Sequence, residues 1–197
     1  MEKITDLSQL DLTKQYTYAD YLTWWFDERV ELFKGYIKKM AAPQERHQRV
    51  SGNLYYKVRH YLNNQPCQVR VAPYDVRLQR SMDNTKITTV VQPDICIICN
   101  PEIIDERGCN GTPDMIIEIV SPNNAKRDVK DKYELYEEAG VKEYWIVFPN
   151  DKMIDVFVLI ANKFQLLKKY VDDDIITVNT IKDLNINLTE IFNYVID

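Results

Sequence analysis

Three charged residues of this sequence stand in stretches that otherwise consist of apolar side chains. Glu118 lies in the run DMIIEIV, and in an extended strand it shares a face with Ile116 and Val120. Asp94 follows a proline at the start of a second apolar run, ICII, and Lys132 lies within a helical pattern. A buried charge without a partner is costly, so each of the three needs a counter-charge, a proton or a metal ion.

The direction of Lys132 follows from the helical repeat of residues 125–139. Successive residues of a helix are rotated by about 100°, and a set of apolar side chains falls within about 60° of the lysine. These side chains are Ala125, Val129, Leu135, Tyr136 and Ala139. Lys130, Glu134 and Glu137 project from the opposite side, which is therefore the solvent face. We expect Lys132 to point inward, where an ammonium needs an anionic partner.

Two carboxylates and one ammonium beside a sheet suit a divalent cation such as Mg²⁺. We expect Asp94 to meet Glu118 from a neighbouring strand, because Asp114 lies four residues before Glu118, about 13 Å away along an extended strand. A divalent ion there would activate water and bind a phosphoryl oxygen, while Lys132 neutralises charge on the phosphate or orients the water. This arrangement suits phosphodiester hydrolysis. The same three charges also fit a buried ion-pair network without chemistry.

The elements that must position these residues are expected to form one domain over residues 1–197, a length sufficient for a sizeable core. Residues 1–28 are expected to form a helical lead-in, with a helix that begins after Thr17 in TYADYL. VELFKGYIKKM is typical of a hairpin that turns at Lys34 and Gly35. Apolar residues recur at helical spacing over 44–64, which predicts a long helix with one buried side.

Strands are expected near 67–80, 90–99 and 114–120, followed by a helix over 125–139 that ends at Gly140. Three more strands, KEYWIVF, MIDVFVLI and FQLLKKY, precede a short closing helix in LTEIFNYV. The central runs are apolar on both faces, as interior strands covered by helices are. Helices that interleave with strands, followed by strands joined through short turns, predict an α/β (α+β) fold with a mixed central sheet flanked by helices.

The formal net charge of -5 argues against a protein that coats nucleic acid through its overall field, although a local basic patch is compatible with it. Lys126, Arg127 and Lys130 are candidates for phosphate contacts, with a solvated helix end as the alternative. The first residues lack the basic and apolar segments of a secretory signal, and no apolar run approaches the ~18 residues of a membrane span. We therefore expect a soluble, globular, cytoplasmic protein.

The four cysteines, Cys67, Cys96, Cys99 and Cys109, include one CxxC motif, CIIC. In a strand, positions three apart point to opposite faces, so Cys96 and Cys99 are poorly placed to share a metal ion. We expect buried free thiols, with metal binding or a disulfide as the alternative.

Several of these residues together resemble a known pattern. It runs from the Pro-Asp pair at Asp94 through Glu118 in IIEIVSP to Lys132 in DVKDKYELY, and then to AGVKEYW. This pattern is similar to that of the Uma-two family, a large bacterial family assigned to the PD-(D/E)XK restriction-endonuclease-like superfamily. The match is specific from about 90 to 149. VELFKGYIKKM and His47 extend it more loosely over most of the chain.

The resemblance implies a restriction-endonuclease-like fold, with Asp94 and Glu118 as ligands of Mg²⁺ or Mn²⁺ and Lys132 as the catalytic lysine. In the wider superfamily the lysine usually stands two residues after the acid, where this sequence has Val120. In the family the lysine has moved to the following helix, which Lys132 fits. A second departure is Phe148, which stands where the family commonly carries an aspartate before a proline.

Further residues are candidates for supporting roles. Glu31 is either an additional acid of the metal site, as in some members of the superfamily, or a solvated strand residue. His47 falls on the apolar face of its helix, so we favour a packed, hydrogen-bonded histidine over a site residue. Asp128 and Tyr136 flank Lys132 by one turn on either side and are expected to hold its ammonium in place.

The sequence thus leaves more than one function open. The first is a metal-dependent endonuclease that hydrolyses DNA, with a homodimer whose two sites address the two strands. The second is a catalytically inactive nuclease-like module that binds nucleic acid or protein, which the acidic net charge and Phe148 favour. A third is a small-molecule hydrolase or a stress-linked factor that uses the same acids.

Overall fold

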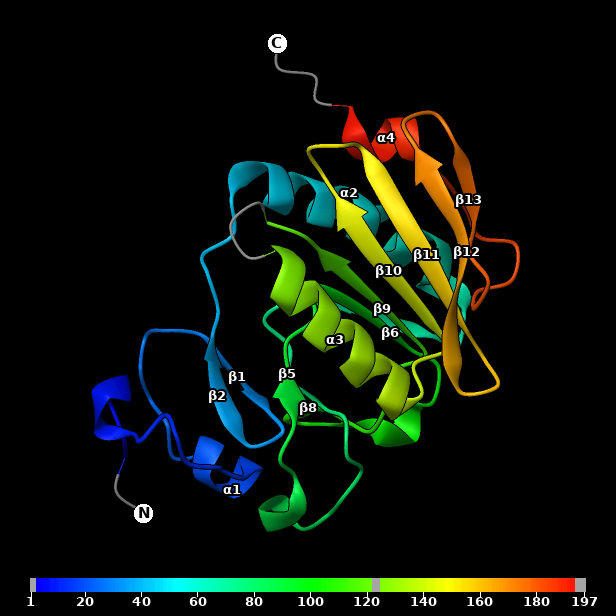
Figure 1. The fold of residues 1–197 in the computed structure, drawn as a ribbon. Helices are drawn as coiled ribbons and strands as arrows, with labels where there is room; N and C mark the ends of the chain where they lie inside the picture. The colour runs from blue at the N-terminus through cyan, green and yellow to red at the C-terminus, as the bar shows by residue number, and fades with distance from the viewer. Residues whose placement is uncertain (1–2, 122–124, 194–197) are drawn as a thin grey trace. The chain divides into compact units, whose positions relative to one another are not determined.

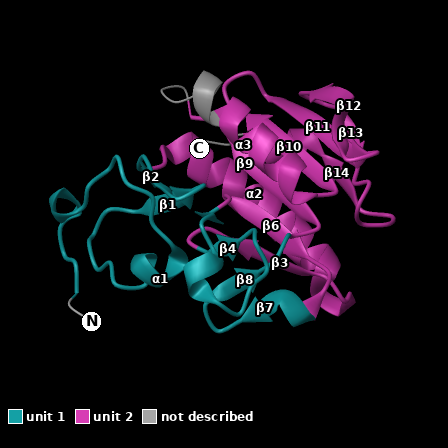
Figure 2. Cartoon of the chain, turned by 60° about the horizontal axis from the view of Figure 1, so that its bottom comes forward, with its two compact units in different colours: residues 1–42, 74–92, 102–112 teal, residues 43–73, 93–101, 113–197 magenta. Residues whose placement is uncertain are grey.

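The structure is a computed structural model that describes residues 3–121 and 125–193, without the side chains of residues 125–128. The chain forms two compact units, coloured separately in Figure 2. Unit 1 comprises residues 1–42, 74–92 and 102–112, and unit 2 comprises residues 43–73, 93–101 and 113–197. Neither unit is a continuous stretch of chain. The expectation of a single domain over the whole chain stays a prediction.

Unit 1 is built on a six-stranded sheet in the order β2-β1-β5-β4-β8-β7. The predicted hairpin is confirmed, and Lys34 and Gly35 at its turn both have positive φ, as the favoured two-residue hairpin turns require. The N-terminal helical segment is shorter than expected, because the helix capped by Thr17 ends after one turn. The elements are α1 (Tyr18–Tyr21), β1 (Val30–Phe33), β2 (Tyr36–Lys39), β4 (Val76–Arg77), β5 (Val90–Val91), β7 (Ile104–Asp105) and β8 (Gly108–Asn110).

A partly buried carboxyl group lies within unit 1. Asp75 accepts hydrogen bonds from Gln92 Nε2 at 2.8 Å and from the Tyr21 hydroxyl at 3.3 Å. Burial raises the pKa of Asp75 above its ordinary value of 3.8, and the two hydrogen bonds oppose this rise without cancelling it. Folding therefore favours the protonated form of this side chain.

Asp75→Asn should change the pH dependence of stability. Because the folded-state pKa of Asp75 is raised, the folded state holds more protons than the unfolded state once pH exceeds about 3.8. Its contribution to stability therefore falls as pH rises through the folded-state pKa. Denaturant unfolding from pH 3.5 to 7 should show that Asp75→Asn removes this loss, whereas the exposed Asp27→Asn keeps it. An unchanged pH slope in Asp75→Asn would contradict the assignment.

Unit 2 contains a six-stranded mixed sheet in the order β12-β11-β10-β9-β6-β3. Only β9 and β10 run parallel in this sheet, and α3 supplies the crossover that a parallel pair needs. The late strands follow one another antiparallel through short turns, as the sequence predicts. The strands are β3 (Gln68–Val71), β6 (Ile95–Ile98), β9 (Met115–Ile119), β10 (Glu143–Phe148), β11 (Met153–Ile160) and β12 (Lys163–Val171).

Helices lie on both faces of this sheet (Figure 1), so the predicted fold class is confirmed. The helix α2 (Glu45–Tyr61) packs on one face and α3 (Ala125–Ala139) on the other. A two-stranded sheet of β13 (Ile175–Thr177) and β14 (Asn185–Asn187), with α4 (Leu188–Phe192), joins the α2 side. Short 3₁₀ helices elsewhere in the chain cover Leu7–Gln9, Leu62–Asn64, Asn84–Lys86 and Pro101–Ile103.

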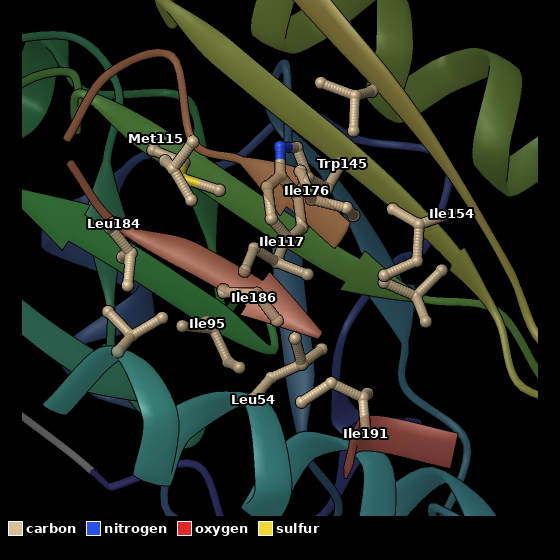
Figure 3. Packing of buried hydrophobic residues seen from close by; sticks show 14 of the residues in the cluster. Leu54, Ile95, Met115, Ile117, Trp145, Ile154, Ile176, Leu184, Ile186 and Ile191 are labelled. Atoms are coloured by element: carbon tan, nitrogen blue, oxygen red, sulfur yellow. The ribbon is translucent and has the colours of Figure 1, made fainter. Parts of the chain in front are cut away.

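The main core of unit 2 lies between the sheet and α2. Figure 3 shows Leu54 of α2 and Ile191 of α4 directed at sheet residues that include Ile95, Ile117 and Trp145. Alternate residues of each strand point to opposite faces, so the neighbours of these core residues face α3. Glu118 belongs to this second set. The sheet's own alternation therefore directs the one carboxylate of β9 towards α3.

Two predicted strand-like stretches each contribute to two different sheets. Residues 67–80 give β3 of unit 2 and β4 of unit 1, while residues 90–99 give β5 of unit 1 and β6 of unit 2. The sequence missed this division because β4 and β5 are two residues long, too short for a repeat of two to be read. The strands β7, β8, β13 and β14 were also missed, because they are only two or three residues long.

The expectation of four free thiols is wrong for two of the cysteines. Cys67 and Cys99 form a disulfide, while Cys96 and Cys109 are buried thiols. The register of β3 against β6 explains the pairing, because Gln68 faces Ile98 and the next residue outward on each chain is a cysteine. Within the CIIC motif, Cys99 is therefore bonded to Cys67 and not to Cys96.

A buried glutamate fastens the last part of unit 2 to the sheet. Glu143 of β10 is fully buried, and Oε1 accepts a hydrogen bond from Trp145 Nε1 at 2.8 Å. The backbone amide of Asn179 donates to Oε1 at 3.2 Å, and that of Thr180 donates to Oε2 at 2.6 Å. The carboxylate therefore satisfies three donors that would otherwise be buried without acceptors.

Glu143→Ala should lower the free energy of unfolding by about 3 kcal/mol or more, because each buried donor left without an acceptor costs about 1–3 kcal/mol. Glu143→Gln keeps one acceptor oxygen and should lose less. Urea denaturation of the three proteins measures both changes. A Glu143→Ala variant within about 0.5 kcal/mol of the wild type would show that the backbone amides find other acceptors.

Candidate active site

Asp94 and Glu118 meet where two antiparallel neighbours of the sheet in unit 2 end. Ile95 of β6 faces Ile117 of β9, so the residues one step further along, Asp94 and Glu118, are cross-strand neighbours. The backbone amide of Ile119 donates to Asp94 Oδ2 at 2.7 Å, which ties the aspartate to β9. The register thus brings together the two acids that the sequence predicts as partners.

Lys132 points inward from α3, as the helical repeat predicts. Its ammonium donates to Glu118 Oε1 at 3.0 Å, and the side chains of Lys132 and Glu118 are only 8% and 11% exposed. The Tyr136 hydroxyl donates to the same oxygen at 2.6 Å. Tyr136 therefore holds the carboxylate of Glu118, while the expectation that it also holds the ammonium of Lys132 stays a prediction. One turn of helix separates Lys132 from Tyr136, which brings both donors to one oxygen.

His47 approaches Asp94 from the first turn of α2. Its Nε2 atom lies 3.1 Å from Asp94 Oδ2, and the two side chains are 12% and 16% exposed. The histidine is packed and hydrogen-bonded, as predicted, but its partner is a predicted metal ligand. The same turn of helix is fastened by Arg46, whose Nη1 donates to Asn150 Oδ1 at 2.8 Å. Nothing in the sequence indicated that Arg46 or the amide of Ile119 would support this site.

The other predicted supporting residues are described to different extents. Glu31 lies in unit 1, where it is buried and accepts a hydrogen bond from the backbone amide of Gln92 at 2.8 Å, so it is not a solvated strand residue. The side chain of Asp128 lies outside the described residues. The patch formed by Lys126, Arg127 and Lys130 is described only at Lys130, which is exposed and pairs with Glu134 at 3.7 Å. A separate ion pair joins Asp114 to Lys142 at 2.6 Å.

The two acids fit a hard divalent cation. Magnesium is commonly bound by one or two carboxylates, with water and substrate phosphate in the other positions. Asp94 Oδ1 accepts no hydrogen bond from the described residues, since both donors to this side chain bind Oδ2. Within the described part of the chain, no three His, Cys, Asp or Glu side chains gather at one point. The donor set therefore suits Mg²⁺ or Mn²⁺ in company with water and phosphate, and does not suit a closed structural zinc site.

The architecture matches that of a solved nuclease-like protein. A crystal structure from Anabaena variabilis, described as a "putative nuclease", has a TM-score of 0.66 against this chain at 18% sequence identity. The alignment covers 90% of this chain and 97% of that one. The likeness shows that this chain shares the fold of that protein.

A comparison of the sequence with family models identifies the family of this chain. The model of the Uma2 family, described as "Putative restriction endonuclease", matches residues 18–189, and the chain belongs to this family. The resemblance seen in the sequence is thereby confirmed. No curated protein matches the sequence. None of the helices among the described residues has the length and apolar character needed to cross a bilayer.

The pair of Lys132 and Glu118 should be energetically coupled. Lys132→Met should lower the free energy of unfolding by about 3 kcal/mol, because it leaves a buried carboxylate without its cation. In the double variant Glu118→Gln, Lys132→Met, the loss should be smaller than the sum of the single losses by about 1 kcal/mol or more. Urea denaturation of the four proteins gives the cycle. Additive single losses would contradict a direct pair.

Proposed function

We propose that this protein is an endonuclease that hydrolyses phosphodiester bonds of DNA and requires Mg²⁺ or Mn²⁺. The observation that carries the proposal is that Lys132 binds Glu118, and that the register of β6 and β9 places Asp94 next to Glu118. Membership of a family described as restriction endonucleases supports DNA as the substrate. The proposal extends to a cytoplasmic protein that acts as a homodimer, with one site for each strand of a duplex.

In this proposal Asp94 and Glu118 hold the cation, which when bound lowers the pKa of water and neutralises charge on the phosphate. Lys132 directs its ammonium at the phosphate or at the attacking water, where it stabilises the charge that develops in the transition state. Tyr136 donates a hydrogen bond that fixes Glu118, and so sets where its carboxylate stands. Glu31 and Asp128 remain candidates for supporting roles.

A second function, a nuclease-like module without catalysis, has one structural observation in its favour. Lys132 and Glu118 form a buried pair in which each charge already has a partner, as in a purely structural ion-pair network. The two functions differ in whether Lys132 separates from Glu118 when a phosphate or a cation binds. Only a catalytic site has to release the ammonium from the carboxylate when its ligands bind.

Cleavage of supercoiled plasmid in the presence of Mg²⁺ or Mn²⁺ tests the proposal. Wild-type protein should cleave it, and Lys132→Met should lose about 100-fold or more in rate, because a preorganised charge at the reacting phosphate is removed. Lys168→Met is the control, since this exposed lysine of β12 pairs with Asp174 and has no proposed role in the site.

Circular dichroism confirms that each variant is folded before its rate is compared. Equal rates for Lys132→Met and wild type would refute the role of the lysine. If wild-type protein cleaves neither DNA nor RNA with either metal, while it still binds nucleic acid, the result would support the non-catalytic function.

A further inference from the structure

Asp94 presents its two carboxylate oxygens differently. Oδ2 receives both the backbone N–H of Ile119, at 2.7 Å, and Nε2 of His47, at 3.1 Å. Oδ1 accepts no hydrogen bond from the described residues. A carboxylate held through one oxygen by two donors from different elements has little freedom to rotate, so the direction of Oδ1 is fixed by the fold.

The imidazole of His47 can be oriented from its contacts. A carboxylate oxygen accepts hydrogen bonds, so Nε2 carries the hydrogen that is shared with Asp94. Nδ1 is buried and has no hydrogen-bond partner among the described residues. A buried N–H without an acceptor is rarer and more costly than a buried nitrogen lone pair without a donor. We therefore assign the lone pair to Nδ1. The ring is thus a donor aimed at one oxygen.

The position of this donor is set by the core of unit 2. His47 lies on the same side of α2 as Val50 and Leu54, both fully buried against the sheet. Arg46, its neighbour, is tied to Asn150 in the turn between β10 and β11. Packing thereby fixes the first turn of α2, and this turn fixes the ring against Asp94.

We infer that His47 is a positioning residue that holds Asp94 with Oδ1 directed at the divalent cation, and that it is not itself a ligand of the cation. The inference rests on the proposed function and deepens it. His47 Nε2 is turned to Asp94 and its Nδ1 is enclosed, so neither nitrogen faces the cation. If His47 only fills space, any side chain that fills the same volume would serve equally.

Calorimetric titration of Mn²⁺ separates these roles. His47→Leu should weaken Mn²⁺ binding about 10-fold or more, in the range found when a group that orients a metal ligand is removed. His47→Gln carries an amide that reaches as far as Nε2 and should stay within about threefold of wild type. The chain's other histidine, exposed His60, provides the control, and His60→Leu should bind as wild type does.

The outcomes of the titration are distinct. Equal affinity of His47→Leu and wild type overturns the positioning role and leaves the metal site standing. Equal loss in His47→Leu and His47→Gln also overturns it, because the donated hydrogen bond would then not be what matters. A wild type that binds no Mn²⁺, alone or with a DNA duplex present, overturns the proposed metal site and this inference with it.

A second measurement needs neither metal nor a variant. Nuclear magnetic resonance correlation of the ring nitrogens with the ring carbon-bound protons reads which nitrogen of His47 carries the hydrogen. The inference requires hydrogen on Nε2 of the wild-type protein without metal. Hydrogen on Nδ1 alone would mean that Nε2 cannot donate to Asp94, and it would overturn the inference even if His47→Leu failed to fold.

Discussion

The arrangement of unit 2 depends on one buried carboxylate near the end of an interior strand of its sheet. Glu118 lies in a strand of Met and Ile residues, so the fold needs a cation within reach of it. The parallel pair of β9 and β10 requires a crossover on one face of the sheet, and α3 is that crossover. Lys132 and Tyr136 of this helix reach Glu118 Oε1 at 3.0 and 2.6 Å. The topology that joins the two strands therefore also delivers the partners of the acid.

The two acids of the site are held by helices that lie on opposite faces of the sheet (Figure 1). Glu118 is held by donors from α3, and Asp94 is held by His47 from α2 together with the amide of Ile119. Each helix is itself fixed by packing, and β6 and β9 are held in register, so the fold sets the positions of both acids. Such support from the second layer of residues is what a metal or catalytic site needs in order to be preorganised.

Part of the fold and of the candidate site could be predicted from the sequence. The bounds of α3, the inward direction of Lys132 and the neighbouring positions of Asp94 and Glu118 followed from the helical repeat and from two apolar runs, because these patterns are local and long enough to be read. The partners of His47 and Tyr136 depend on how distant elements pack, which a repeat cannot reveal. The pairing of Cys67 with Cys99 likewise depends on the register of β3 against β6.

The central claim is that Asp94 and Glu118 together bind a divalent cation. Crystals grown with Mn²⁺ and measured at a wavelength where manganese scatters anomalously would locate the ion directly. We expect one strong anomalous peak within about 2.5 Å of Asp94 Oδ1, with Glu118 as the second protein ligand. Crystals of Asp94→Asn should lack the peak. A wild-type map with no peak between these carboxylates, or with manganese bound only elsewhere on the chain, would contradict the account.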